Sequence, residues 1–185
     1  MQLVIKVIAL IFILNSTASG NCGGNFTQFL EDIKKEFLEL GYTELEISAF
    51  LKGVSLNPKV LEADRAQAIF QKPFNEFAPR LISEYRIIQG FKNLKKYSST
   101  FNEIKQIYGV SPGVLASFWA LETDFGEVQG DFNTRDALVT LAFDCRRPLL
   151  FRPQIFAALE LFSQNQFKPN TTKGAWAGEI GMVQM

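Results

Sequence analysis

The sequence contains no histidine among its 185 residues and only two cysteines. Without histidine the chain cannot form the Ser–His or Cys–His pairs that activate many catalytic nucleophiles, and a transition-metal site is disfavoured. Lysine plus arginine and aspartate plus glutamate both number 19, so there is no excess positive charge to bind nucleic acid. We therefore expect no cofactor, no metal and no nucleic-acid partner.

The N-terminus has the features of a secretory signal. Lys6 lies within an apolar stretch over residues 3–14, which is too short to span a bilayer comfortably, and small residues follow up to Gly20. We predict a signal peptide over residues 1–20 and one exported domain over residues 21–185. A domain of that length can bury a substantial core.

The two cysteines are Cys22 and Cys145. An even number of cysteines in an exported protein favours one disulfide between them. A reactive cysteine nucleophile is the alternative, but the sequence offers no evident activating group. Acylation of Cys22 would instead anchor the chain to a membrane. Because Asn21 stands where a small residue is expected, lipid anchoring is the lesser alternative.

Apolar residues recur at helical spacing almost throughout, and no segment alternates convincingly at the strand period. One apolar stripe runs through residues 26–40, and Thr43 with Glu46 forms a capping box for the next helix. Further helices are expected after Pro58, over 79–108 with a polar break near 98–99, from Asn133 or Thr134 through Phe143, and from Pro153 onward. With 18 phenylalanines, this pattern predicts a mainly α domain with a densely aromatic core.

Residues 110–126 contain a further predicted helix. Ser111 is a suitable N-cap, and Gly126 is a suitable stop. Three large apolar side chains on this helix are expected in the core: Leu115, Phe118 and Trp119.

The carboxylate of Glu122 lies at the far end of this apolar helix. We expect this side chain to be partly desolvated, which would keep a proton available near neutral pH, as a general acid requires. The alternative is that Glu122 simply begins the solvated end of a core helix.

A second informative segment covers residues 174–185, in which three glycines occur within eight residues. That density of glycine fits neither a regular helix nor a good strand. It lets a backbone approach a ligand closely, while Trp176 and Gln184 supply stacking and hydrogen bonds. Sugars are bound by this combination of groups.

Three segments resemble the membrane-bound lytic transglycosylase B-like family, whose members cleave bacterial peptidoglycan. They are Ala120-Leu121-Glu122-Thr123-Asp124-Phe125-Gly126, Asp136-Ala137-Leu138-Val139-Thr140-Leu141-Ala142-Phe143 and Trp176-Ala177-Gly178-Glu179-Ile180-Gly181-Met182-Val183-Gln184. The resemblance extends from about Phe26 to the C-terminus. It implies a lysozyme-like helical fold around a saccharide-binding cleft. It also implies a catalytic domain that continues past Met185, so we expect the C-terminal part to be missing from this sequence.

The resemblance further implies a lytic transglycosylase with Glu122 as its single acid/base. Such an enzyme cleaves the β-1,4 bond between N-acetylmuramic acid and N-acetylglucosamine, and the muramyl 6-hydroxyl attacks its own anomeric carbon. The product is a 1,6-anhydromuramyl sugar, and no water is consumed. The alternatives are a water-using muramidase, which needs a second carboxylate, and a catalytically impaired peptidoglycan-binding remnant.

Further site residues follow from the same resemblance. Gln184 is a substrate-contacting amide, and Trp176 belongs to the substrate-binding segment. Arg147 and Arg146 match a basic pair that can hold a peptide or lactyl carboxylate, although an ordinary surface pair is the alternative. Where many relatives carry a serine that orients the catalytic glutamate, this chain has Ala175. We expect a periplasmic monomer whose partners are peptidoglycan glycan strands and other cell-wall enzymes.

Overall fold

The computed structural model describes residues 24–67 and 73–184. The predicted signal peptide, and Cys22 with it, lie outside the described residues. The elements are α2 (Phe26–Glu39), α3 (Glu44–Leu51), α4 (Pro58–Arg65), α5 (Phe74–Leu81), α6 (Glu84–Lys96), α7 (Ser98–Tyr108), α8 (Pro112–Thr123), β1 (Phe132–Asn133), α9 (Thr134–Phe143), α10 (Pro148–Ser163) and β2 (Lys173–Gly174). The prediction of a mainly α fold is confirmed. No helix in these two ranges is long and apolar enough to cross a membrane.

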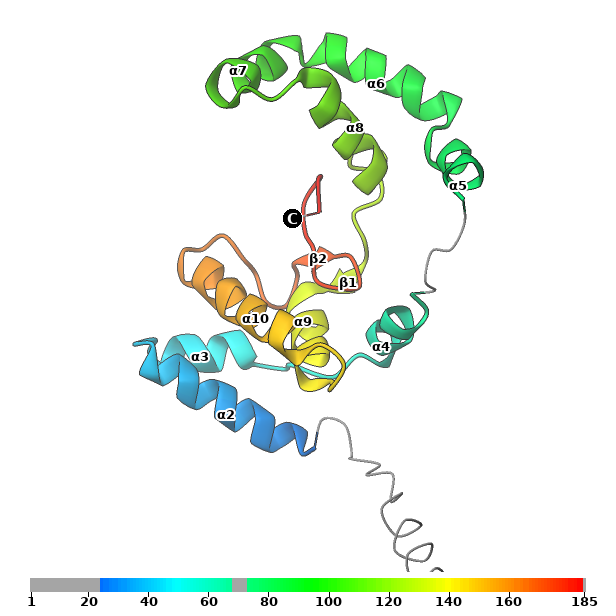
Figure 1. Ribbon diagram of the computed structural model, residues 1–185. Helices are drawn as coiled ribbons and strands as arrows, with labels where there is room; N and C mark the ends of the chain where they lie inside the picture. Colours follow the sequence, from blue (N-terminus) through cyan, green and yellow to red (C-terminus); the bar gives the residue numbers. More distant parts are fainter. Residues whose placement is uncertain (1–23, 68–72, 185) are drawn as a thin grey trace, which may run out of the picture.

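The helices fall into two groups. Figure 1 shows α5 to α8 at one end of the molecule and α2, α3, α9 and α10 at the other, with the two short strands between them. The strands pair antiparallel, with Phe132 opposite Gly174 and Asn133 opposite Lys173. This pairing joins the chain that leaves α8 to the chain that follows α10.

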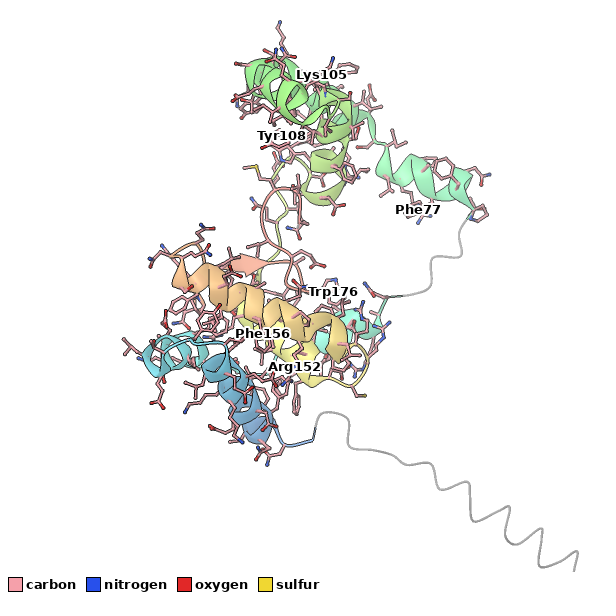
Figure 2. All side chains as sticks on the ribbon, turned by 60° about the vertical axis from the view of Figure 1, so that its left-hand side comes forward. Phe77, Lys105, Tyr108, Arg152, Phe156 and Trp176 are labelled. Carbon is pink, nitrogen blue, oxygen red and sulfur yellow. The ribbon has the colours of Figure 1, made fainter. Side chains whose placement is uncertain are left out.

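The main core surrounds α9, in which eight of ten residues are buried. Phe37 and Phe50 are fully buried on α2 and α3, and their rings pack edge-on with centroids 6.1 Å apart. Phe37 also meets Phe156 of α10 with a centroid separation of 4.9 Å, and Figure 2 shows Phe156 on that helix. The aromatic core predicted from the phenylalanine content is therefore concentrated where α2, α3 and α10 meet.

Local capping sets several helix starts. The Thr43 hydroxyl accepts a hydrogen bond from the backbone N–H of Glu46, and the Glu46 carboxylate accepts one from the N–H of Thr43, which confirms the predicted capping box. Asn133 caps α9 by accepting from the backbone N–H of Asp136. These contacts involve neighbours in the sequence, so sequence patterns could predict them.

Two helix boundaries differ from expectation. The segment over 79–108 forms the end of α5, then α6 and α7, and Pro79 lies inside α5. The last long helix begins at Pro148, and Pro153 lies inside it. The predicted start at Pro153 is therefore wrong, because Pro148 takes the first helical position, where the missing N–H of proline costs no hydrogen bond.

Helix α8 presents a different face to the core from the predicted one. Its buried residues are Ala116, Ala120 and Thr123, which recur at helical spacing on one side. Phe118 is 52% exposed, so its predicted place in the core is wrong. Leu115 and Trp119 are only half-buried. Small side chains on the inner face let α8 pack against α6, and that packing leaves Phe118 on the outer face.

This orientation predicts a contrast between two phenylalanine truncations. Phe50→Ala should lower the free energy of unfolding by about 3–5 kcal/mol, because it empties a fully buried position. Phe118→Ala should lower it by less than about 1 kcal/mol. Urea unfolding of the two variants measures both values, and equal losses would show that the face of α8 is misassigned here.

Candidate active site

Glu122 lies at the surface, one residue before the end of α8. It is exposed, so the described residues do not provide the expected desolvation of its carboxyl group. The helix ends before the predicted stop at Gly126, because Asp124 and Phe125 adopt left-handed conformations with φ of 48° and 63°. Asp124 thus takes the terminal position at which glycine is usual.

The buried Thr123 joins the end of α8 to the glycine-rich segment. Its hydroxyl donates a hydrogen bond to the backbone oxygen of Met182 at 2.5 Å, and accepts one from the N–H of Gly126 at 2.9 Å. Two of the three motifs, separated by about sixty residues, are therefore brought into contact next to Glu122. The sequence did not single out Thr123 for this role.

Gln184 lies close to the same junction. Its side-chain nitrogen donates to the backbone oxygens of Gln129 and Gly181 at 3.2 and 3.0 Å. The residue also has a positive φ of 53°. These contacts fix the amide against the loop that leaves α8, so Gln184 and Glu122 belong to one region of the surface.

The glycines of this segment serve packing within the protein. A Cβ at Gly174 would lie 2.1 Å from the backbone oxygen of Glu179, and one at Gly178 would lie 2.4 Å from Leu138 Cδ2. Both glycines thus allow the segment to fold tightly on itself and onto α9. The expectation that glycine serves close approach of a ligand does not hold at these two positions. At Gly181, by contrast, no atom would lie within 4 Å of an added Cβ.

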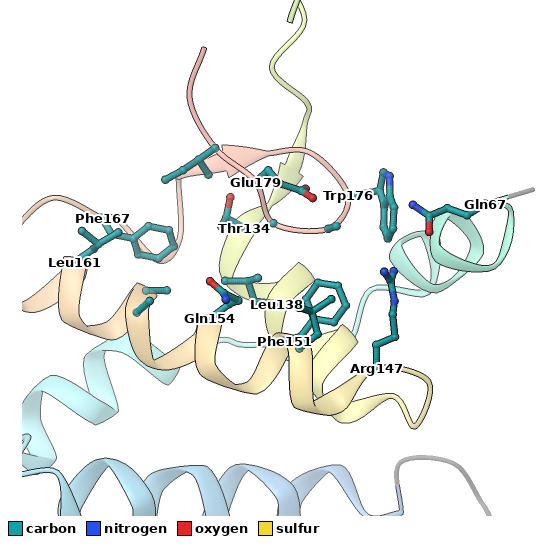
Figure 3. A pocket seen from close by; sticks show the side chains of 16 residues that line it. Gln67, Thr134, Leu138, Arg147, Phe151, Gln154, Leu161, Phe167, Trp176 and Glu179 are labelled. Atoms are coloured by element: carbon teal, nitrogen blue, oxygen red, sulfur yellow. The ribbon is translucent and has the colours of Figure 1, made fainter. Parts of the chain in front are cut away.

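Trp176 and Arg147 line a separate pocket of about 320 Å³ between α10 and the glycine-rich segment. Figure 3 shows the two side chains at the same end of this pocket, with Gln67 beside them. The buried hydroxyl of Thr134 also lines it, without a hydrogen-bond partner among the described residues. Glu122 does not line this pocket. The predicted site residues are therefore divided between the end of α8 and the pocket.

The arginine pair is held by a buried aspartate of α4. Arg146 Nη1 lies 2.7 Å from Asp64 Oδ2 and donates to the Asp64 backbone oxygen at 2.6 Å, while Arg147 forms an ion pair with Asp64 Oδ1. Asp64 is only 1% exposed. Its burial raises the pKa, but the hydrogen bonds and charges of both arginines outweigh burial and lower the pKa overall. The arginines are thus not an ordinary solvated surface pair.

The two arginines differ in what they offer to a ligand. Both guanidinium groups are paired with Asp64, but Arg146 does not line the pocket. Arg147 lines the pocket, and its guanidinium carbon lies 5.1 Å from the ring centre of Phe151. Its Nε is buried without a hydrogen-bond partner among the described residues. Arg147 is therefore the better candidate of the two for binding a substrate carboxylate.

The chain is similar to known proteins over most of its length. Residues 25–185 match the model of a family described as the transglycosylase SLT domain. Membrane-bound lytic murein transglycosylase B of Escherichia coli is 29% identical over 109 residues, which are 58% of this chain and 30% of that protein. The mainly helical architecture is also found in a solved structure, SltB3 from Pseudomonas aeruginosa in complex with NAG-NAM-pentapeptide.

That structure aligns with a TM-score of 0.80 and 27% identity over 88% of this chain and 43% of the other. The same Pseudomonas protein in complex with NAG-anhNAM-pentapeptide gives the same values. These matches confirm the predicted lysozyme-like helical fold. The chain spans less than half of the length of these relatives.

The Asp64 contacts predict an acid-sensitive contribution to stability. Because the pKa of Asp64 is lowered by folding, its stabilisation is complete above the unfolded value of about 4 and is lost as pH falls through the lower folded value. Asp64→Asn should lower the free energy of unfolding by about 2 kcal/mol at pH 7, and by less at pH 3.

Asp131→Asn is the matched control, because it removes one partner of the exposed Lys173–Asp131 ion pair. It should change the free energy of unfolding by no more than about 0.5 kcal/mol. Denaturant titrations between pH 3 and 7 measure both variants. An Asp64→Asn loss that is small or independent of pH would contradict the assigned role of Asp64.

Proposed function

The chain belongs to the transglycosylase SLT domain family, and on that premise we propose that it cleaves peptidoglycan glycan strands as a lytic transglycosylase. The bond broken would be the β-1,4 linkage between N-acetylmuramic acid and N-acetylglucosamine. The relatives named above support this substrate class, because one is a murein transglycosylase and the other binds NAG-NAM-pentapeptide.

The proposal rests on the contact between the end of α8 and the glycine-rich segment. The Thr123 hydroxyl binds the Met182 carbonyl, which places the end of α8 against the segment that carries Gln184. Glu122 is exposed beside this junction and accessible to a polymer too large to enter a closed cavity. A single open carboxylate next to an anchored amide suits cleavage of a glycan strand lying across the surface.

Glu122 would act first as acid and then as base. Its proton passes to the glycosidic oxygen as the bond from that oxygen to the muramyl anomeric carbon breaks. The carboxylate then takes the proton of the 6-hydroxyl of the same muramyl residue, whose oxygen bonds to the anomeric carbon. Because the nucleophile is tethered to the reacting ring, this closure is favoured over attack by a separate molecule. The bound strand itself would exclude water from the exposed Glu122.

The environment of nearby acidic residues supports a single-carboxylate mechanism. Among the described residues, Asp124 is paired with Arg86, Asp131 with Lys173 and Asp136 with Arg135. A muramidase needs a second carboxylate that can activate water. Glu127 is the nearest following acidic residue for which no ion pair is found in the described part of the chain. We therefore take Glu127 as the acidic residue with which to test the muramidase alternative.

The pocket beside α10 would hold a further part of the substrate. Trp176 offers an aromatic face to a sugar, and Arg147 offers a cation to a lactyl or peptide carboxylate. Thr134, whose hydroxyl has no hydrogen-bond partner among the described residues, also lines this pocket. The pentapeptide carried by the ligand of the Pseudomonas relative is consistent with such a carboxylate.

A substrate in the cell wall would require export, so we propose that the protein acts in the periplasm after removal of residues 1–20. A peptidoglycan-binding remnant without catalysis is the second candidate function. It is favoured by the exposure of Glu122, which lacks the desolvation expected of a general acid. Binding of glycan strands without turnover would distinguish that function from the first.

We predict that Glu122→Gln abolishes product release from purified sacculi. The variant keeps the size and hydrogen bonding of the side chain but removes its transferable proton, so turnover should fall at least about 100-fold while binding to sacculi persists. Chromatography with mass detection of the released muropeptides measures the loss.

Glu127→Gln is the control for this experiment. Transglycosylation predicts that this variant still releases anhydro products at a rate close to that of the unmodified protein. Reducing-end products that disappear in Glu127→Gln would establish the muramidase instead. Retention of activity in Glu122→Gln would refute the assignment of the acid/base.

We also predict a Cys22–Cys145 disulfide in the exported protein. Cys145 lies between α9 and α10, whereas Cys22 is outside the described residues. The bond would close a loop long enough for a stabilisation on the order of 4–5 kcal/mol in the loop-entropy model. Thiol labelling of non-reduced, denatured protein should detect no free thiol, and labelling of both cysteines would contradict the pairing.

A further inference from the structure

The end of α8 is held by a side chain from a distant part of the sequence. Arg86 on α6 forms a two-pronged ion pair with Asp124, with Nε 2.5 Å from Oδ1 and Nη2 3.0 Å from Oδ2. Its third nitrogen, Nη1, donates to the backbone oxygen of Leu81 at the end of α5. The guanidinium of Arg86 thus links the ends of α5 and α8 to α6.

The residue that Arg86 holds determines how α8 terminates. Asp124 has a φ of 48°, and its backbone N–H closes the helix by donating to the oxygen of Ala120 at 3.1 Å. Phe125 follows with a φ of 63°, and its N–H donates to the oxygen of Trp119. Left-handed conformations are costly for residues other than glycine and persist where other contacts enforce them. The ion pair is such a contact.

The pair is partly shielded from solvent, since the side chains of Arg86 and Asp124 are 20% and 30% exposed. The hydrogen bond from Arg86 lowers the pKa of Asp124 despite opposing burial, so the carboxylate stays charged at neutral pH. On the other side, Thr123 is bound to the Met182 carbonyl. Glu122 therefore precedes two residues that are each anchored to a different segment of the protein.

Ala175 has no hydroxyl and so cannot orient Glu122 through a side-chain hydrogen bond. We propose that Arg86 and Asp124 are positioning residues for Glu122, acting through the backbone at the end of α8. This inference rests on the proposed function of Glu122. A displacement of about 1 Å in a reacting group can cost on the order of a hundredfold in rate. The Arg86–Asp124 ion pair, which lies two residues from Glu122, can therefore affect kcat without contacting the substrate.

The test separates the ion pair from the backbone conformation. Asp124→Asn keeps the size of the side chain and a residue type that tolerates positive φ, but removes the charge. Arg86→Lys keeps the charge but loses the two-pronged geometry. Both variants should lower kcat on soluble glycan strands at least about tenfold and change KM by less than about twofold. The loss of kcat in the double variant should be no greater than the loss in the more impaired single variant, because both substitutions break the Arg86–Asp124 ion pair.

Asp131→Asn is the matched control, since it breaks an exposed ion pair outside the proposed machinery and should leave kcat unchanged. Backbone amide exchange gives a readout that is independent of activity. In Asp124→Asn and Arg86→Lys, exchange at residues 124–126 should accelerate at least about tenfold, while exchange in α9 should not change.

The outcomes keep the two proposals apart. An unmodified protein that releases no product would overturn the proposed function, and amide exchange would still decide whether the pair holds the end of α8. Unchanged exchange in both variants would overturn the positioning role, whatever the activity. Faster exchange together with an unchanged kcat would overturn it as well. A loss expressed in KM alone would show that the pair serves binding and not the placement of Glu122.

Discussion

The buried guanidinium of Arg135 is the interaction on which the rest of the structure depends. Arg135 is 2% exposed in the first turn of α9, and a charge so placed must be matched by partners. Its Nη1 donates to the backbone oxygens of Phe50 and Lys52 at 2.9 and 3.0 Å. The same nitrogen lies 3.2 Å from Asn170 Oδ1, and Nε donates to Asp136. The end of α3, the loop before β2 and the start of α9 are thereby fixed together.

The contacts of Arg135 hold the start of α9, and the candidate site is connected to α9 through the strands and the glycine-rich segment. The chain enters α9 through β1, which pairs with β2, and the segment after β2 packs Gly178 against Leu138 of α9. That segment then reaches the end of α8, where Met182 receives the hydrogen bond from Thr123. The pocket is lined by residues of α9 and α10, whereas Glu122 lies at the end of α8, which belongs to the other group of helices. Its position therefore depends on a small number of tertiary contacts.

Features that depend on residues close together in the sequence could be predicted. The Thr43 capping box, the Asn133 cap and the presence of α8 follow from residues within a few positions of one another. Features that depend on packing between segments distant in the sequence could not be predicted. Phe118 is as apolar as a core residue, and only the packing of α8 shows that its face is exposed.

The candidate site shows the same division. Glu122, Trp176 and Gln184 stand in recognisable motifs, and the sequence could single them out. Asp64 and Arg86 stand in no motif, because their roles come from partners about eighty and forty residues away. A buried aspartate on a short helix has no sequence signal that distinguishes it from a solvated one. The arginine pair could accordingly be predicted, but the carboxylate that holds it could not.

The central claim is that Glu122 directs cleavage without water. Digestion of purified sacculi in water labelled with oxygen-18, followed by mass spectrometry of the released muropeptides, tests this most directly. The account predicts muramyl ends that carry no label and are one water lighter than hydrolysis products. Labelled reducing ends released by this protein would contradict it.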